Sequence, residues 1–166
     1  MKKIILSFAL LLCMCVGAIA QTKVLYNNGP IGLDWKFKRS FVQGTTLVVD
    51  FTVTNNTGRD LTEFRPYRSG FDEQGKSIGV VAYDDEGNMY SGDYQPNQIG
   101  FSFANQYDYN PISLPTGNMI KARVQIKGID EFATQITTFI SPILIPALGP
   151  NSWSVLRVTN IPIPRE

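Results

Sequence analysis

The chain contains no histidine, and its two cysteines, Cys13 and Cys15, both lie within the first twenty residues. These absences exclude nucleophilic catalysis that pairs serine or cysteine with histidine, and they exclude nearly all zinc and copper sites. Carboxylate, lysine and tyrosine chemistry is what remains. We therefore expect a protein that is not an enzyme and has no cofactor, with a carboxylate-dependent hydrolase as the remaining enzymatic alternative.

The first twenty residues have the pattern of a cleaved signal peptide. Lys2 and Lys3 begin it, residues 4–16 form an apolar run that is short for a bilayer span, and residues 18–20 read Ala-Ile-Ala, a small-x-small cleavage pattern. Neither cysteine follows a small residue, so we expect no lipid anchor. We expect residues 21–166 to be one domain, exported to the periplasm or beyond, with no membrane insertion after cleavage. An uncleaved membrane anchor is the alternative.

Charge is sparse and balanced. The chain has 15 basic and 14 acidic residues, a net charge of +1. Without Lys2 and Lys3, 13 basic residues face 14 acidic ones, a net charge of −1. Nucleic acids and anionic membranes call for a clustered positive surface, so we expect neither as a partner. The composition does not predict an oligomeric state.

No segment has a sustained helical period, apart from one possible turn at residues 130–133. Instead, residues 46–56, TLVVDFTVTNN, alternate with period two and run into an Asn-Asn-Thr-Gly turn. Residues 120–127, IKARVQIK, alternate as well and place Lys121, Arg123, Gln125 and Lys127 on one face. We interpret this basic row as a solvated face of an antiparallel sheet, with a binding stripe as the alternative.

Six further segments have strand composition: residues 33–37, 61–67, 80–83, 99–104, 136–140 and 155–161. Turns rich in glycine, proline and asparagine separate them. About 7 to 9 short strands without helices predict an all-β fold, an immunoglobulin-like antiparallel β-sandwich. The Cys…Trp…Cys hallmark of antibody domains is missing, so the chain is not an antibody-type domain.

An acidic stretch, AYDDEGNMY, occupies residues 82–90. We interpret it as a hairpin turn in which Asp84 or Asp85 accepts backbone amide hydrogen bonds and Gly87 supplies the left-handed residue. The EF-hand spacing fails, because the sixth position from Asp84 is Met89 and not glycine. An irregular calcium site is the alternative, formed by Asp84, Glu86, Asn88 and Asp93.

Residues 90–111, YSGDYQPNQIGFSFANQYDYNP, interleave aromatic rings with amides and carboxylates. Rings stack on apolar faces and amides satisfy hydroxyl or backbone groups, so this stretch predicts a surface for a glycan or a peptide. The alternative is that Phe101 and Phe103 belong to the core and that the tyrosines cap a long loop. The candidate ligand-binding residues are Tyr90, Tyr94, Asn105, Tyr107, Asp108 and Tyr109.

Several motifs together resemble a known group of proteins: FTVTNNTGRDL, AYDDEGNMY, the turn at residues 114–117, KARVQIKGIDEFATQI and VTNIPI. They are similar to motifs of small secreted proteins of Gram-negative gut bacteria, which are immunoglobulin-like β-sandwiches related to domains of bacterial lipoproteins, largely of unknown function. The resemblance covers roughly residues 45–163. It implies the fold and an envelope address, and it transfers no catalytic residue. Residues 95–109 lie outside the recognised pattern, which points to them for the specificity of this member.

These observations predict an exported, non-enzymatic binding or interaction module. Its expected partner is a glycan or an extended protein segment, bound through the aromatic-rich surface. The alternative is a structural partner in a cell-envelope assembly, joined through a sheet edge and without a small-molecule ligand.

Overall fold

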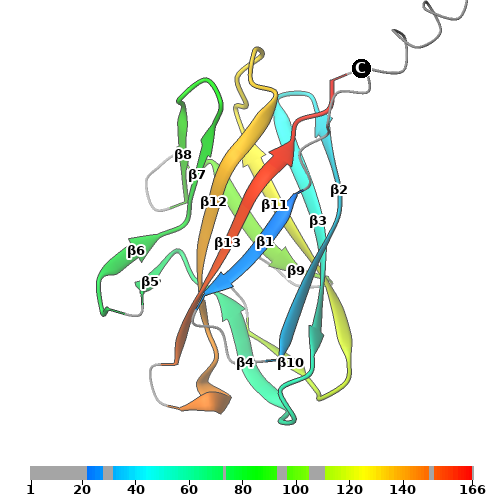
Figure 1. Cartoon of the computed structure of the whole chain (residues 1–166), viewed down its shortest axis with the longest axis vertical. Coiled ribbons are helices and arrows are strands. Elements are labelled where there is room, and N and C mark those ends of the chain that lie inside the picture. The colour runs from blue at the N-terminus through cyan, green and yellow to red at the C-terminus, as the bar shows by residue number, and fades with distance from the viewer. Residues whose placement is uncertain are drawn as a thin grey trace, which may run out of the picture.

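A computed structural model of the chain describes residues 22–27, 32–72, 74–92, 97–104, 111–149 and 152–165. In these ranges the protein is all-β, with antiparallel strands and one short 3-10 helix (Figure 1). The described residues include no helix with the length and hydrophobicity that crossing a bilayer requires. The expected signal peptide, residues 1–20, lies outside the described residues.

The described elements are, in chain order, β1 (Lys23–Asn27), β2 (Leu33–Gln43), β3 (Thr46–Asn55), β4 (Leu61–Pro66), β5 (Ser69–Phe71), β6 (Ser77–Gly79), β7 (Val81–Asp84), β8 (Met89–Ser91), β9 (Ile99–Phe103), β10 (Ile112–Leu114), β11 (Met119–Lys127), β12 (Gln135–Leu144), η2 (Pro146–Leu148) and β13 (Trp153–Pro162). A seven-stranded sheet has the order β1-β13-β12-β4-β10, with β7 also paired to β12 and β8 to β7. A four-stranded sheet has the order β2-β3-β11-β9, and β5 pairs with β6.

The two large sheets face each other across an aromatic core. The ring of Trp35 on β2 lies 6.5 Å from that of Phe64 on β4, measured between centroids. Phe101 on β9 lies 6.2 Å from Phe139 on β12 in the same way. All four side chains are buried, and each pair joins one sheet to the other. Inner faces that interdigitate in this manner are the arrangement of a β-sandwich, so the predicted all-β class is confirmed.

The alternation predicted for β11 is confirmed, and the strand predicted at β3 is present, but Val48 and Thr52 on its outer face are buried as well. The two strands pair antiparallel from Met119 opposite Thr54 to Lys127 opposite Thr46. Ala122, Val124 and Ile126 of β11 are buried, and Lys121, Arg123 and Lys127, which alternate with them, are exposed. The basic row therefore lies on the outer face of the four-stranded sheet.

A small hairpin, β5–β6, packs on the outer face of the seven-stranded sheet. The ring of Trp153 lies 5.0 Å from that of Tyr67 and 5.9 Å from that of Phe71. A Cβ atom placed on Gly70 would lie only 2.4 Å from Trp153 Cζ3. Position 70 therefore needs glycine, because the hairpin backbone rests directly on the indole ring.

Candidate functional site

The acidic stretch at residues 82–90 is a turn held by its own carboxylate. Asp84 Oδ1 accepts hydrogen bonds from the backbone N–H groups of Glu86, at 3.0 Å, and Asn88, at 2.8 Å. Gly87 has a φ of 86°, in the region that favours glycine. The hairpin-turn interpretation is therefore confirmed.

The other oxygen of Asp84 continues this network into the core. Asp84 Oδ2 accepts hydrogen bonds from Asn88 Nδ2, at 2.9 Å, and from the Tyr90 hydroxyl, at 2.7 Å. Burial alone would raise the pKa of Asp84, but the hydrogen bonds from Tyr90, Asn88 and the Glu86 backbone outweigh it and hold the pKa below its usual value. Burial, together with the adjacent Asp84 carboxylate, raises the pKa of Tyr90 to about 12. The pair is thus a carboxylate and a neutral phenol at neutral pH.

This geometry changes the role expected for Tyr90. Its side chain is only 2% exposed, so Tyr90 is a core residue and does not lie on a ligand-binding surface. Its hydroxyl group can be buried because it has two hydrogen-bond partners. It donates to Asp84 and accepts from the Asp130 backbone N–H at 3.2 Å. The expected roles of the other candidates, Tyr94, Asn105, Tyr107, Asp108 and Tyr109, stay predictions because these residues lie outside the described ranges.

The calcium alternative receives no support from the donor set. Four protein donors already bind the two oxygens of Asp84. Asn88 directs its amide nitrogen to Asp84 and Asp130, and Glu86 is exposed. In the described part of the chain, no group of three or more His, Cys, Asp or Glu side chains is arranged to hold a metal. Asp93, the fourth expected ligand, lies outside the described residues.

Asp85, the next acid, fastens the turn to the connection between β11 and β12. Its Oδ1 accepts the backbone N–H groups of Thr134, at 2.9 Å, and Gln135, at 3.2 Å. Its Oδ2 accepts the Thr134 hydroxyl. The carboxylates of Asp84 and Asp85 thus both stabilise the fold through hydrogen bonds within the protein.

A groove of about 780 Å³ crosses the outer face of the four-stranded sheet. All four strands contribute to its lining. The charged lining residues are Lys38, Arg39, Asp50, Lys121 and Arg123, and the hydroxyl-bearing ones are Thr52 and Ser102. The groove therefore places charged and hydroxyl-bearing side chains around a partly apolar floor, and it lies where the sequence predicted a basic row.

Strand register arranges these side chains in rows across the sheet. Arg39 of β2 is opposite Asp50 of β3, and Asp50 is opposite Arg123 of β11. Arg123 is in turn opposite Ser102 of β9. In the next row, Thr52 of β3 is opposite Lys121 of β11. The lining takes only two or three consecutive positions from each strand region but includes all four, so the groove runs across the strands and not along them.

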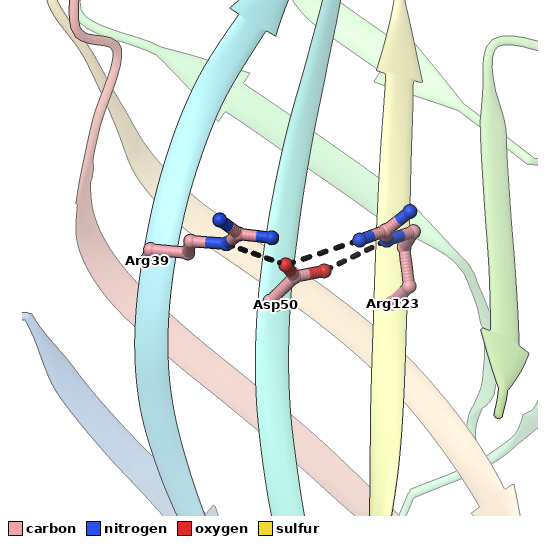
Figure 2. A network of polar contacts seen from close by, with 3 residues as sticks. All are labelled: Arg39, Asp50 and Arg123. Atoms are coloured by element: carbon pink, nitrogen blue, oxygen red, sulfur yellow. Dashed lines mark hydrogen bonds and ion pairs between the residues drawn. The ribbon is translucent and has the colours of Figure 1, made fainter.

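Figure 2 shows Asp50 between the two arginines. Asp50 Oδ2 accepts from Arg39 Nε at 2.9 Å, and Oδ1 accepts from Arg123 Nε at 2.7 Å. Arg123 Nη2 adds a second bond to Oδ2 at 3.1 Å. The hydrogen bond from Arg123, aided by Arg39, lowers the pKa of Asp50 against the effect of its partial burial, and the same contact raises the pKa of Arg123. Asp50 is therefore ionised at neutral pH and holds both guanidinium groups in place.

The groove carries more positive charge than the chain as a whole. The described part of its lining includes four basic residues and one acidic residue, a net charge of +3, whereas the whole chain has +1. Asp50 compensates part of the charge of the two arginines. Among the described residues, Lys38 and Lys121 form no ion pair. The groove is therefore a local positive region on a nearly neutral protein.

Small side chains on β9 and directly after it lower one side of the groove. Ser102 of β9 and Ala104, which follows the strand, line it, whereas the side chains of Phe101 and Phe103, which alternate with them, are buried. The sequence-based alternative that placed these two phenylalanines in the core is thus confirmed. Beside β9, the long side chains of Lys121 and Arg123 stand on β11, so the surface is hollowed next to them.

A second, smaller cavity of about 450 Å³ lies between the β5–β6 hairpin and the outer face of the seven-stranded sheet. Its charged lining residues are Asp72, Lys76 and Arg157. Asp72 Oδ1 accepts the backbone N–H groups of Gln74 and Lys76, at 3.0 and 2.8 Å, and so closes the hairpin turn. This cavity therefore has less excess charge than the groove, and its acid has a structural role.

Fold alone does not imply function, because one fold supports many kinds of site. A role can be transferred from another protein only where a relative shows the same site residues. For this chain, no protein-family model, no curated protein and no solved structure gives a match.

Proposed function

We propose that the protein is an exported, non-enzymatic binding module that recognises a glycan or an extended protein segment. The observation that carries this proposal is the groove across the four-stranded sheet. Its volume, about 780 Å³, falls within the range of ligand pockets, which is about 300 to 1,000 Å³. Its polar groups stand on paired strands, which hold binding groups more precisely than loops do. We also propose that the sandwich is immunoglobulin-like, as the sequence motifs suggest.

The chemistry of the groove supports binding over catalysis. Asp50 is the one carboxylate of the described lining, and the two arginines hold it in its ionised form. Because its pKa is lowered, Asp50 has no proton to donate at neutral pH, and its carboxylate is a weak base. Glycoside hydrolysis uses two carboxyl groups that flank the bond, and the described lining provides one.

The tyrosine-rich stretch at residues 105–109 directly follows a residue that lines the groove, and we therefore include it in the proposed site. Ala104 lines the groove, and Asn105 is the next residue. Tyr107 and Tyr109 follow three and five residues after Ala104. We propose that these rings add stacking contacts to a ligand that the groove binds through its polar groups.

A glycan and peptide panel tests the proposal. The purified protein is run in native gels that contain individual polysaccharides, and peptides are titrated by calorimetry. We expect at least one ligand to bind, Lys121→Gln to weaken it, and Lys127→Gln to leave it unchanged. Lys127 is the matched control, because it lies on the same face of β11 outside the groove. Equal loss in both variants would contradict the groove as the site. If a folded Tyr107→Ala/Tyr109→Ala variant binds with full affinity, the two tyrosines are not part of the binding site.

One observation favours a second function, a structural partner in an envelope assembly. Among the described strands, β9 pairs on one side only, with β11. An unpaired strand edge can accept a strand from another protein. This alternative predicts a specific protein that co-purifies with the chain and stays bound to Lys121→Gln. If no ligand of the panel binds and such a protein does co-purify, the structural role would be favoured over ligand binding.

A further inference from the structure

Resting on the proposed binding function, we infer that the ligand of the groove is an acidic polysaccharide. Its carboxylate or sulfate groups bind Arg39 and Arg123, and further acidic groups along the same chain bind Lys38 and Lys121.

The arginines have free donors that point to an anion. An arginine side chain has five N–H donors in a fixed planar fork. Asp50 takes one of these donors from Arg39, through Nε, and two from Arg123, through Nε and Nη2. Both guanidinium groups therefore keep several N–H groups for a ligand. Arginine binds carboxylates and other oxyanions in the bidentate manner that such donors allow.

Asp50 is a positioning residue in this arrangement. A guanidinium group on a flexible side chain loses conformational entropy when a ligand orders it. Asp50 orders Arg39 and Arg123 in advance through hydrogen bonds of 2.9 and 2.7 Å. Arg39 is also held over the ring of Phe41, 5.1 Å from its centroid. One carboxylate orients two cations and leaves a positive charge in excess, which an anionic ligand can neutralise.

The spacing of the cations favours a polymer over a small anion. Arg39 and Arg123 stand on strands that flank β3, which corresponds to about 9.6 Å between their backbones at the usual strand spacing. Lys121 and Arg123 are two residues apart on β11, about 6.8 Å at the usual rise of an antiparallel strand. One carboxylate can contact both arginines, as Asp50 does, but Asp50 forms no ion pair with Lys38 or Lys121. A chain that carries acidic groups at intervals can contact the arginines and the lysines together.

The direction of the groove and its other groups favour a polysaccharide over a peptide. A peptide that adds to a sheet needs free backbone groups along a strand edge. The groove crosses β3 and β11, whose backbone groups pair with neighbouring strands on both sides. What it offers beside the cations is the hydroxyl group of the partly exposed Ser102, which suits the hydroxyls of a sugar chain.

The lining also disfavours a nucleic acid. Single-stranded nucleic acids bind to a positive groove through bases that stack on exposed aromatic rings. The aromatic residues of the described lining are Phe51 and Phe103, which are 1% and 3% exposed and point into the core. The described groove therefore supplies the charge for a polyanion without the stacking platforms for bases.

Matched polysaccharides test the inference. Polygalacturonate is compared with its fully methyl-esterified form, and dextran sulfate with dextran, so that each pair shares a backbone and differs in charge. We expect the full-length protein, as purified, to bind at least one acidic form at least tenfold more tightly than its neutral partner. The pair that discriminates identifies the anion as carboxylate or sulfate. Binding should weaken as the sodium chloride concentration rises, because salt screens exposed charges.

Charge variants locate the contact. Lys38→Gln/Lys121→Gln should weaken binding to the acidic form by about tenfold, since two exposed charges are lost. Lys127→Gln, on the same face, should bind as the unaltered protein does. These lysines form no ion pair with described residues, so the double variant keeps the Asp50 network that the fold contains. Circular dichroism checks that it is folded.

Each other outcome overturns the inference in a distinct way. Equal affinity for the acidic and neutral forms would refute an acidic ligand and leave the proposed glycan-binding function standing. Equal or tighter binding of poly-glutamate would assign the groove to an acidic protein, and of single-stranded DNA to a nucleic acid. Failure to bind any of these probes would overturn both the inference and the proposed glycan-binding function.

Discussion

The substitution Tyr90→Phe tests whether the buried turn network stabilises the fold. It removes one hydroxyl group and keeps the ring, so that packing changes little. The lost hydroxyl donates to Asp84 Oδ2 at 2.7 Å and accepts from the Asp130 backbone N–H at 3.2 Å. Asp84 is 4% exposed, so water cannot easily replace the missing donor.

The expected cost follows from these two contacts. A hydrogen bond to a charged group contributes about 1.5 to 3 kcal/mol, and a donor left without an acceptor adds to this loss. We therefore expect the free energy of unfolding to fall by about 2 to 4 kcal/mol. For a domain of this size, such a loss lowers the Tm by roughly 5 to 15 °C.

Urea unfolding followed by circular dichroism at neutral pH measures this loss. Tyr83→Phe is the matched control, because Tyr83 lies on the same hairpin and is 38% exposed. The cost should also shrink in acid. The folded pKa of Asp84 lies below its unfolded value of about 3.9, so the stability that the carboxylate contributes is present above that value and is lost as the pH falls through the folded pKa. A cost below about 0.5 kcal/mol, no greater than that of an ordinary surface substitution, would refute the reasoning.

Three further outcomes are expected. Gly70→Ala should destabilise the protein by about 1 to 3 kcal/mol in urea unfolding, because its Cβ would overlap Trp153, whereas Ser69→Ala should change little. Acid should destabilise the fold as the pH falls below about 4, because Asp50, Asp84 and Asp85 all have lowered pKa values, and a flat stability profile down to pH 2 would contradict this. A chelator should leave the Tm unchanged, since protein donors bind both oxygens of Asp84, and a lower Tm would restore the calcium hypothesis.

Local patterns were sufficient for β3, β11 and the acidic turn, but they predicted only residues 33–37 of β2, which continues to Gln43. β3 and β11 were predictable because one face of each strand is buried, which forces alternation on the sequence. The three-residue strands β5, β6, β8 and β10 are too short to show a period. The prediction for β12 stopped at residue 140, although the strand continues past Pro142 to Leu144. Proline fits there because β12 changes its partner from β7 to β4 at that point. The ladder on this side of β12 is therefore already interrupted, while the ladder with β13 on the other side continues.

The groove depends on features that alternation cannot reveal. Leu33, Trp35 and Phe37 lie on the inner face or close to it, so strict alternation would direct Arg39 inward as well. A register shift between Phe37 and Arg39 inserts Lys38 as an extra residue and turns Arg39 outward. The Asp50–Arg123 contact joins residues that are 73 positions apart, and this pairing follows from topology. The sequence signal that was present, an acid at an outward position of β3, becomes informative only when its neighbours are known.

The row that crosses the four-stranded sheet also has a consequence for the edge strand. β9 is bound to β11 alone among the described strands, so its amides depend on one ladder, which includes the region where the Ala104 N–H bonds to the Lys121 carbonyl at 2.7 Å. A polymer laid from Arg39 to Ser102 would fasten this strand to the three other strands of the sheet from outside. Occupancy of the groove would then suppress fraying, and hydrogen exchange at the amides of β9 would slow in proportion to the bound fraction.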